Sequence, residues 1–109
     1  MTIASVRIIP PPEKRKDVLE VLKYLQGRMR ASVGCVSCAI YEECDEVSAI
    51  LCLEQWRSQH DLHRHIQSPL YRQMLIAIDM ASELPEIRFH EVASSQGMEL
   101  IEALRGAEA

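Results

Sequence analysis

The stretch EQWRSQHDLHRHIQSPLY, residues 54–71, decides the fold of this chain. It starts at the end of an apolar run typical of a strand, where Glu54 and Trp56 share one face because side chains alternate along a strand. Ser58 has the residue type that caps a helix, and we expect a helix from there to about residue 67. Ser68-Pro69 starts a second helix, since proline is favoured in the first helical turn. The stretch therefore predicts a strand followed by two helices.

Two successive apolar runs, the second of which ends at residue 56, predict a β-hairpin. They are Cys35–Glu42 and Val47–Trp56, and the polar segment 43–46 between them has the length of a hairpin connection. If the turn centres on Asp45, Cys38 lies opposite Cys52. One face then carries Val36, Cys38, Ile40, Ile50, Cys52, Glu54 and Trp56, and the other carries Ala39, Tyr41, Ala49, Leu51 and Leu53.

Both faces of this hairpin are apolar, which predicts that both are covered. A sheet covered on one side only would alternate apolar and polar residues along each strand. Helices of the same chain can cover one face, and the simplest cover for the other is the equivalent sheet of a second copy. We therefore expect a homodimer that forms through the sheet face.

The flanking segments complete an α+β pattern. Thr2–Ile9 is rich in β-branched residues and ends at Pro10-Pro11-Pro12, so it predicts a first strand. A helix follows from Glu13, with apolar residues at spacings of three and four: Val18, Leu19, Val21, Leu22, Leu25 and Met29. Pro85 opens a last strand, Glu86–Val92. The order β-α-β-β-α-β predicts a ferredoxin-like four-stranded antiparallel sheet with helices on one face.

The C-terminal residues lie beyond this pattern. The segment Gln96–Arg105 predicts an amphipathic helix whose apolar residues are Met98, Leu100, Ile101 and Leu104. We therefore divide the chain into a ferredoxin-like domain, residues 1–93, and a C-terminal helical extension, residues 94–109. The extension packs on a partner subunit, caps the end of the paired sheets or forms a loose tail, and the sequence leaves these three open.

Composition narrows the class of protein. The chain has 109 residues, 48% hydrophobic and 26% charged, which is the balance of one globular domain. Its net charge of −4 comes with scattered signs, whereas binding of nucleic acid needs a basic face. No apolar run approaches the ~20 residues of a membrane span, and the N-terminus lacks the pattern of a signal peptide. We expect a cytoplasmic protein whose cysteines are mostly reduced, buried thiols.

Several of these motifs, in this order, resemble the antibiotic biosynthesis monooxygenase family. They are the strand end Glu54-x-Trp56, a helix with Leu62 and His65, the step Ser68-Pro69 and the aromatic Tyr71. Gly34-Cys35-Val36-Ser37, before the second strand, is similar to the Gly-Cys segment of the family after its first helix. The resemblance covers about residues 2–93. It implies a dimeric α/β barrel in which the sheets of two ferredoxin-like subunits pair, with a ligand cavity between sheet and helices.

The resemblance also implies a function. Some relatives oxidise quinols or polycyclic phenols with dioxygen and without a cofactor, which makes a cofactor-independent monooxygenase acting on a small aromatic substrate the leading hypothesis. The haem-degrading branch resembles this chain in fold, but it has Trp at the position of His65 and its haem-ligating His at the position of Leu75. We count that difference against haem. The alternative is a non-enzymatic module of the same fold that binds a small ligand or assembles with partners.

Four residues are candidates for the site. His65 has an imidazole that can act as base on a phenolic hydroxyl, or it makes a structural contact to the backbone or to Glu54. Trp56 forms a cavity wall against an aromatic substrate, or it belongs to the core. An isolated Glu54 carboxylate on an apolar face would be costly, so we expect it to pair with His65 or Arg88. Tyr71 either offers its phenol group to a quinone-like ligand or occupies an ordinary half-buried structural position.

Histidine and cysteine spacings argue against a metal site. His60, His63 and His65 lack the i, i+4 spacing that places two ligands on one helix face. Cys35 and Cys38 lie on a predicted strand, where residues three apart point to opposite faces. The register above makes Cys38 and Cys52 cross-strand neighbours, so their redox state stays open.

Overall fold

The structure, a computed structural model, describes residues 1–106 of the chain. Residues 107–109, the end of the expected C-terminal extension, lie outside the described residues. In chain order the elements are β1 (Thr2–Ile8), the short 3-10 helix η1 (Pro12–Lys14), α1 (Arg15–Arg30), β2 (Cys35–Glu42), β3 (Ile50–Trp56), α2 (Gln59–Ile66), α3 (Pro69–Asp79), β4 (Glu86–Glu91) and α4 (Met98–Arg105).

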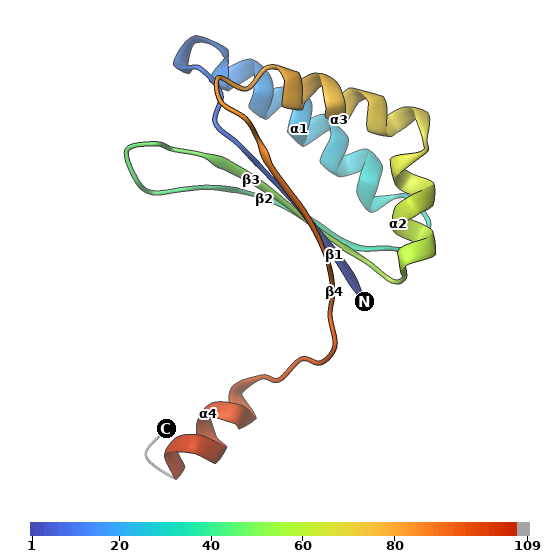
Figure 1. Cartoon of the computed structure of the whole chain (residues 1–109), viewed down its shortest axis with the longest axis vertical. Coiled ribbons are helices and arrows are strands. Elements are labelled where there is room, and N and C mark those ends of the chain that lie inside the picture. The colour runs from blue at the N-terminus through green and yellow to red at the C-terminus, as the bar shows by residue number, and fades with distance from the viewer. Residues whose placement is uncertain (107–109) are drawn as a thin grey trace.

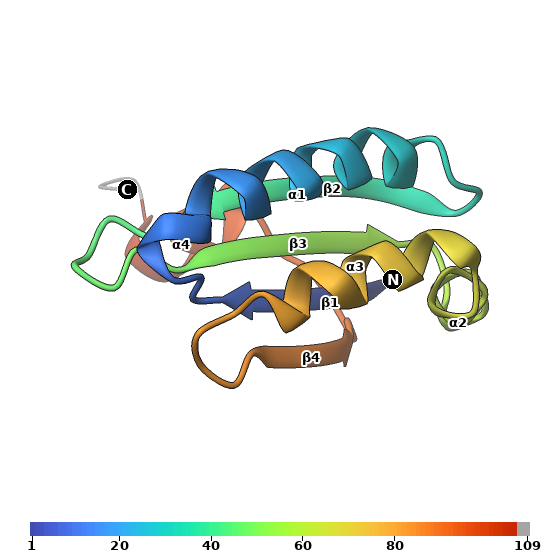
Figure 2. The same ribbon diagram turned by 90° about the horizontal axis from the view of Figure 1, so that it is seen from above.

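The four strands form one antiparallel sheet in the order β2-β3-β1-β4. Helices α1 and α3 lie side by side over one face of the sheet, and α2 lies at its end (Figure 2). The opposite face, which we call the open face, has no helix packed against it in the described part of the chain (Figure 1). This arrangement confirms the predicted α+β, ferredoxin-like fold.

The core lies between the sheet and the helices, where strand alternation and helical spacing meet. Every second residue of β1 and of β3 is buried. Helices α1 and α3 each add four buried residues at spacings of three and four: Val18, Leu22, Leu25 and Met29 from α1, and Tyr71, Met74, Ala77 and Ile78 from α3. The apolar pattern of the sequence therefore fixes which face of each element is buried.

The predicted hairpin register is wrong by two residues. Cys38 lies opposite Glu54 and Ile40 lies opposite Cys52, so Cys38 and Cys52 are diagonal neighbours. The connection runs over residues 43–49, longer than predicted, and Ser48 within it has a φ of 52°. Because a two-residue shift preserves alternation, the faces of the two strands are still as predicted. Val36 is the exception, since a β-bulge between Cys35 and Ser37 leaves it 52% exposed.

In two of its three paired rows, the open face is apolar over β2 and β3 and polar over β1 and β4; the third row has polar residues on β2 and β3 and Ile3 on β1. The paired rows of this face are Tyr41–Leu51–Arg7–Glu86, Ala39–Leu53–Ser5–Arg88 and Ser37–Gln55–Ile3–His90. The predicted apolar face is therefore present on β2 and β3 in two of the three rows. Leu51 and Leu53 stay partly exposed, whereas Ala49 is fully buried in the loop.

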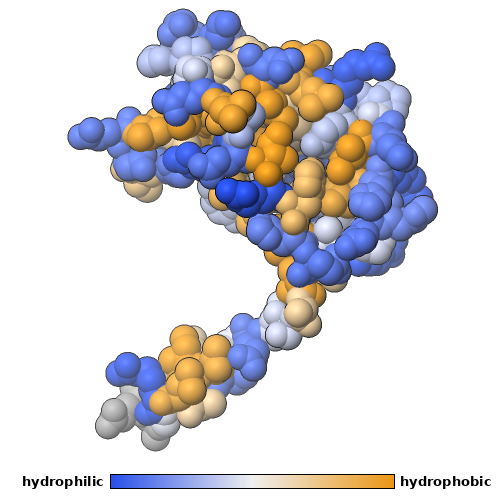
Figure 3. All heavy atoms as spheres, in the orientation of Figure 1, coloured by the Kyte–Doolittle hydropathy of each residue, from blue (hydrophilic) through white to orange (hydrophobic). Residues whose placement is uncertain are grey.

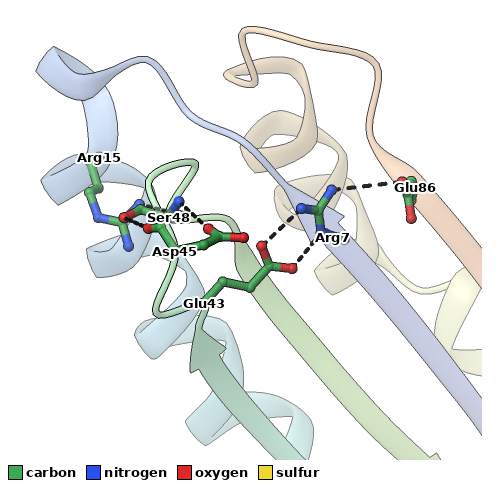
Figure 4. A network of polar contacts seen from close by, with 6 residues as sticks. All are labelled: Arg7, Arg15, Glu43, Asp45, Ser48 and Glu86. Carbon is green, nitrogen blue, oxygen red and sulfur yellow. Dashed lines mark hydrogen bonds and ion pairs between the residues drawn. The ribbon is translucent and has the colours of Figure 1, made fainter.

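A polar network at one end of the sheet holds the β2–β3 loop in place (Figure 4). Nε and Nη2 of Arg7 donate to the two carboxylate oxygens of Glu43, at 2.7 and 2.9 Å, and Nη1 lies 3.7 Å from Glu86. Arg15 donates to the carbonyl oxygen of Ser48, and the amide of Ser48 donates to Asp45 at 3.0 Å. The bidentate geometry of the Arg7 pair fixes the loop relative to β1 and β4.

Helix α4 stands away from the rest of the molecule. The chain leaves β4 and runs through residues 92–97 to α4, which lies on the side of the sheet opposite to α1 and α3 (Figure 1). None of its residues is buried. Within residues 1–106, no helix has the length and apolar character needed to cross a membrane.

Candidate functional site

The turn between α1 and β2 positions the start of α2. Gly34 has a φ of +85°, and its carbonyl oxygen accepts a hydrogen bond from the amide of Arg57 at 2.8 Å. A Cβ atom at Gly34 would lie 2.3 Å from Cγ of Asp61, so only glycine fits. Asp61 is itself buried, and its amide donates to the capping oxygen of Ser58 at 3.2 Å. The predicted cap at Ser58 is thus confirmed.

Three aromatic rings meet beneath α2. The ring of His65 stacks on Trp56 with centroids 4.6 Å apart and planes inclined by 26°. Tyr71, at the start of α3, meets His65 edge to face at 5.3 Å. These distances are those of favourable aromatic pairs. The end of β3, helix α2 and the start of α3 therefore bring together Trp56 and Tyr71, which lie 15 positions apart in the sequence.

Glu54 lies behind this aromatic cluster and is only 1% exposed. Its Oε1 accepts a hydrogen bond from Nε1 of Trp56 at 2.9 Å and lies 3.7 Å from Nε2 of His65. The expected contact with His65 is therefore present, at a distance longer than a hydrogen bond. The alternative partner, Arg88, was wrong, because Arg88 lies opposite Ser5 on the open face while Glu54 points to the helices.

Burial favours the uncharged forms of all three titratable groups of the cluster. Desolvation raises the pKa of Glu54, and the hydrogen bond from Trp56 offsets only part of that effect. Desolvation lowers the pKa of His65 to about 4. It also raises the pKa of Tyr71. Glu54 and His65 lie within ion-pair distance, but burial shifts both pKa values against the charged forms and so disfavours an ion pair between them.

His65 has one unused nitrogen. Among the side-chain nitrogen and oxygen atoms buried in residues 1–106, Nε2 of His65 is the one without a hydrogen-bond partner. Buried polar atoms are nearly always paired, so an orphan atom marks a strained or functional position. The imidazole is unprotonated at neutral pH and can accept a proton, although a pKa of about 4 makes it a weaker base than an exposed histidine.

The cluster borders a recess of about 310 Å³ at the protein surface. The recess lies between the α1–β2 turn and α2, and it is lined by Ala31, Ser32, Val33, Trp56, Asp61, Arg64, His65 and Ser68. Val33, at 66% exposure, and the half-exposed Arg64 leave it open to solvent. Of the four candidate site residues, Trp56 and His65 line this recess, while Glu54 and Tyr71 lie behind them.

A second recess, of about 340 Å³, lies on the opposite side of α2 and was not predicted. It is lined by Thr2, Gln59, Leu62, His63, Ile66, Phe89, His90 and Glu91. The apolar residue Phe89 of the last strand was its signal in the sequence. That signal was insufficient, because the recess depends on how far α2 lies from the edge strand β4.

The cysteines and the acidic residues do not add a metal centre to the described residues. Each of the four cysteines is a free thiol, with Cys38 and Cys52 buried on the helix side of the sheet. Within residues 1–106, no three His, Cys, Asp or Glu side chains gather closely enough to hold a metal ion.

Comparison with known proteins places this geometry in context. The family model described as antibiotic biosynthesis monooxygenase matches residues 1–75. Among curated proteins, the uncharacterized protein sll1783 of Synechocystis is 26% identical over 86 residues, which are 78% of this chain and 58% of that protein. The chain thus matches little more than half of that relative's length.

Solved structures share the fold at low identity. A candidate antibiotic biosynthesis monooxygenase from Deinococcus radiodurans superposes with a TM-score of 0.81 at 18% identity, over 89% of this chain and 97% of its own. Rv0793 from Mycobacterium tuberculosis gives a TM-score of 0.77 at 21% identity, over 89% of this chain and all of its own. These likenesses establish the fold and leave the chemistry to the residues of the site.

Proposed function

The chain belongs to the antibiotic biosynthesis monooxygenase family, and from this premise we propose that it oxidises a hydroquinone or related aromatic small molecule with dioxygen. The observation that supports the proposal most is His65, whose ring lines an open recess and which burial keeps unprotonated at neutral pH. Phenol oxidation without a cofactor requires a positioned group that accepts the phenolic proton, and the unprotonated imidazole of His65 is the candidate for it.

In the proposed reaction His65 takes the phenolic proton of the bound substrate. The phenolate gives up electrons to dioxygen more readily than the phenol, and oxygen adds at a ring carbon that bears hydrogen. The resulting hydroperoxide loses water and leaves a second carbonyl on the ring. One phenol and one dioxygen thus yield one quinone and one water, so atoms and electrons balance with no further reductant.

The neighbours of His65 have separate parts in this proposal. Trp56 supplies the wall of the recess against which a flat aromatic ring can lie, and its stacking fixes the orientation of the imidazole. Glu54 holds the indole in place through its hydrogen bond. Glu54 and Tyr71 lie behind Trp56 and His65. We propose that they contact the substrate only if its binding widens the recess as far as these two residues.

We also propose that the protein is a homodimer that pairs through the open face. Leu51, Leu53 and Ala39 form an apolar surface there that no helix of the described chain covers. A second copy with the same surface would cover it symmetrically. The division into a domain of residues 1–93 and an extension of residues 94–109 belongs to the same proposal.

A second candidate function has one specific observation in its favour. The space between sheet and helices is filled by core side chains, and both recesses lie beside α2 rather than beneath the helices. A filled interior is what a non-enzymatic module that binds a small ligand or a partner would show. The first candidate function consumes dioxygen and substrate, whereas the second only binds a ligand. A measurement of oxygen uptake therefore separates them.

Oxygen uptake by metal-stripped protein tests the proposed reaction. A panel of benzoquinols, naphthoquinols and polycyclic phenols is assayed with wild-type protein, with His65→Gln and with His60→Gln, whose histidine is exposed on the same helix. We expect His65→Gln to lower kcat by about 100-fold or more, as loss of a general base does, and His60→Gln to leave it unchanged. Binding of a quinol with equal oxygen uptake by wild type and His65→Gln would contradict the role of His65 and favour the binding module.

A further inference from the structure

We propose that α4 is an exchanged arm, which holds a second copy of the chain by packing its apolar side on that copy. The inference rests on the sheet-to-sheet pairing proposed above and not on the proposed reaction. It gives a purpose to a helix none of whose residues is buried.

The first argument is that α4 has an apolar side, as a buried helix does, although none of its residues is buried. Its apolar residues are 41–77% exposed: Met98, Leu100, Ile101 and Leu104. At 100° per residue they occupy one side of the helix, while Glu99, Glu102 and Ala103 occupy the other. Figure 3 shows these apolar side chains gathered on the helix, apart from the main body. Such a stripe is typical of a helix that packs against protein.

The second argument is that α4 is too short to persist alone. It has eight residues, whereas isolated helices below about 12–15 residues are marginal in water. In soluble proteins most helical stability comes from packing of an apolar face. A stable α4 therefore needs a surface to pack on.

The third argument concerns the shape of the chain. The Cα radius of gyration is 16.2 Å, whereas a compact domain of this length has about 13 Å. The excess comes from the arm, because residues 92–97 carry α4 away from the sheet on its open side (Figure 1). An arm on that side points to where the second copy would lie.

The fourth argument excludes α4 as the cover of its own open face. A helix of eight residues is about 12 Å long and 10 Å wide. Four strands of about seven residues span roughly 19 by 24 Å. The helix would cover only about a quarter of that area, whereas an equivalent sheet would cover it all. The six residues 92–97 span up to about 20 Å, enough to pass the second sheet, which packs about 10 Å away.

The test measures the dimer dissociation constant of the full chain by sedimentation. Leu104→Glu places a charge on the apolar side of α4, and the matched control Ala103→Glu places the same charge on the other side. We expect Leu104→Glu to raise the dissociation constant by about 100-fold or more, because two symmetry-related leucines lose their contacts at once. The dissociation constant of Ala103→Glu should stay within about threefold of the wild-type value, well below the change expected for Leu104→Glu.

Hydrogen exchange on the same proteins provides a second readout. The amides of α4 should be protected in the wild-type dimer and should exchange quickly in Leu53→Glu, which removes the sheet pairing itself. Equal dissociation constants for Leu104→Glu and Ala103→Glu would overturn the arm while leaving the sheet-paired dimer intact. A wild-type protein that is monomeric at all concentrations would overturn both, and oxygen uptake would still decide the proposed reaction separately.

Discussion

His65 shows how burial alone can set the protonation state of a site residue. Its ring lies between Trp56 and Tyr71, with Nε2 facing the carboxyl group of Glu54, whose pKa burial raises. The consequence is a base that is uncharged at neutral pH and available to accept a proton. That state follows from the packing of the three rings, so it should persist without substrate.

The low pKa of His65 predicts a pH-dependent loss of stability. A histidine with a pKa near 6.5 when unfolded and about 4 when folded binds protons more readily in the unfolded state, so the free energy of unfolding falls as pH drops from 6.5 to 4. At about 1.4 kcal/mol per pH unit the largest loss is roughly 3 kcal/mol. Glu54 acts in the opposite direction, because its raised pKa removes stability as pH rises above 4.5.

Urea denaturation from pH 4 to 7, with wild type and His65→Gln, separates these effects. The wild type should lose more stability than the variant between pH 6.5 and 4. Titration of the His65 ring by NMR should give a midpoint near 4. A midpoint at 6 or above would show that the ring is solvated or paired with an ionised Glu54.

Residue-scale prediction from sequence succeeded where the cause was local. Ser58 as a cap and the shared face of Glu54 and Trp56 follow from helix ends and strand alternation. The recess beside Phe89 and the exposure of Val36 did not follow, because one depends on the distance between distant elements and the other on a bulge.

At the scale of elements, two glycines of the chain predict opposite effects of the same substitution. Gly34→Ala forces a Cβ against Asp61 at a positive φ, and we expect a loss of about 2 kcal/mol or more. Gly27→Ala lies in α1 with no atom near the new Cβ, so the gain in helix propensity should stabilise by about 0.5–1 kcal/mol.

Chemical denaturation of both alanine variants checks this pair. The Gly34 variant should also alter the recess, since the turn at Gly34 and the start of α2 form its wall. Similar unfolding free energies for the two variants would mean that the turn at Gly34 relaxes freely.

Element boundaries and strand register differed in how well the sequence specified them. The apolar pattern fixed which face of β2 and β3 is buried, because a one-residue slip would invert every side chain. It did not fix the register, because a two-residue slip keeps the faces and the loop 43–49 contains no glycine to mark its turn.

At the scale of the whole molecule, stability should be coupled to association. If the open faces pair, the thermal midpoint of unfolding rises with protein concentration, because mass action stabilises the folded dimer. Leu53→Glu should abolish this dependence. Calorimetry over a 100-fold range of concentration measures it, and a midpoint independent of concentration in the wild type would contradict a dimer that dissociates on unfolding.

The fold as a whole was predictable because its order of elements and its patterns of burial are consistent along the chain. The placement of α4 was not predictable. Its eight residues have an amphipathic pattern, which indicates that the helix packs on something but does not identify the surface. The periodicity of a single chain indicates which face is covered but does not identify what covers it.

Trp56 is the only tryptophan of the chain, and it is fully buried against His65. Its fluorescence therefore reports on this one place, free of background from any other indole. Ligand in the recess, protonation of the imidazole or loosening of α2 would each change the emission of the same fluorophore. The protein thus contains its own optical label at the position where the proposed chemistry occurs.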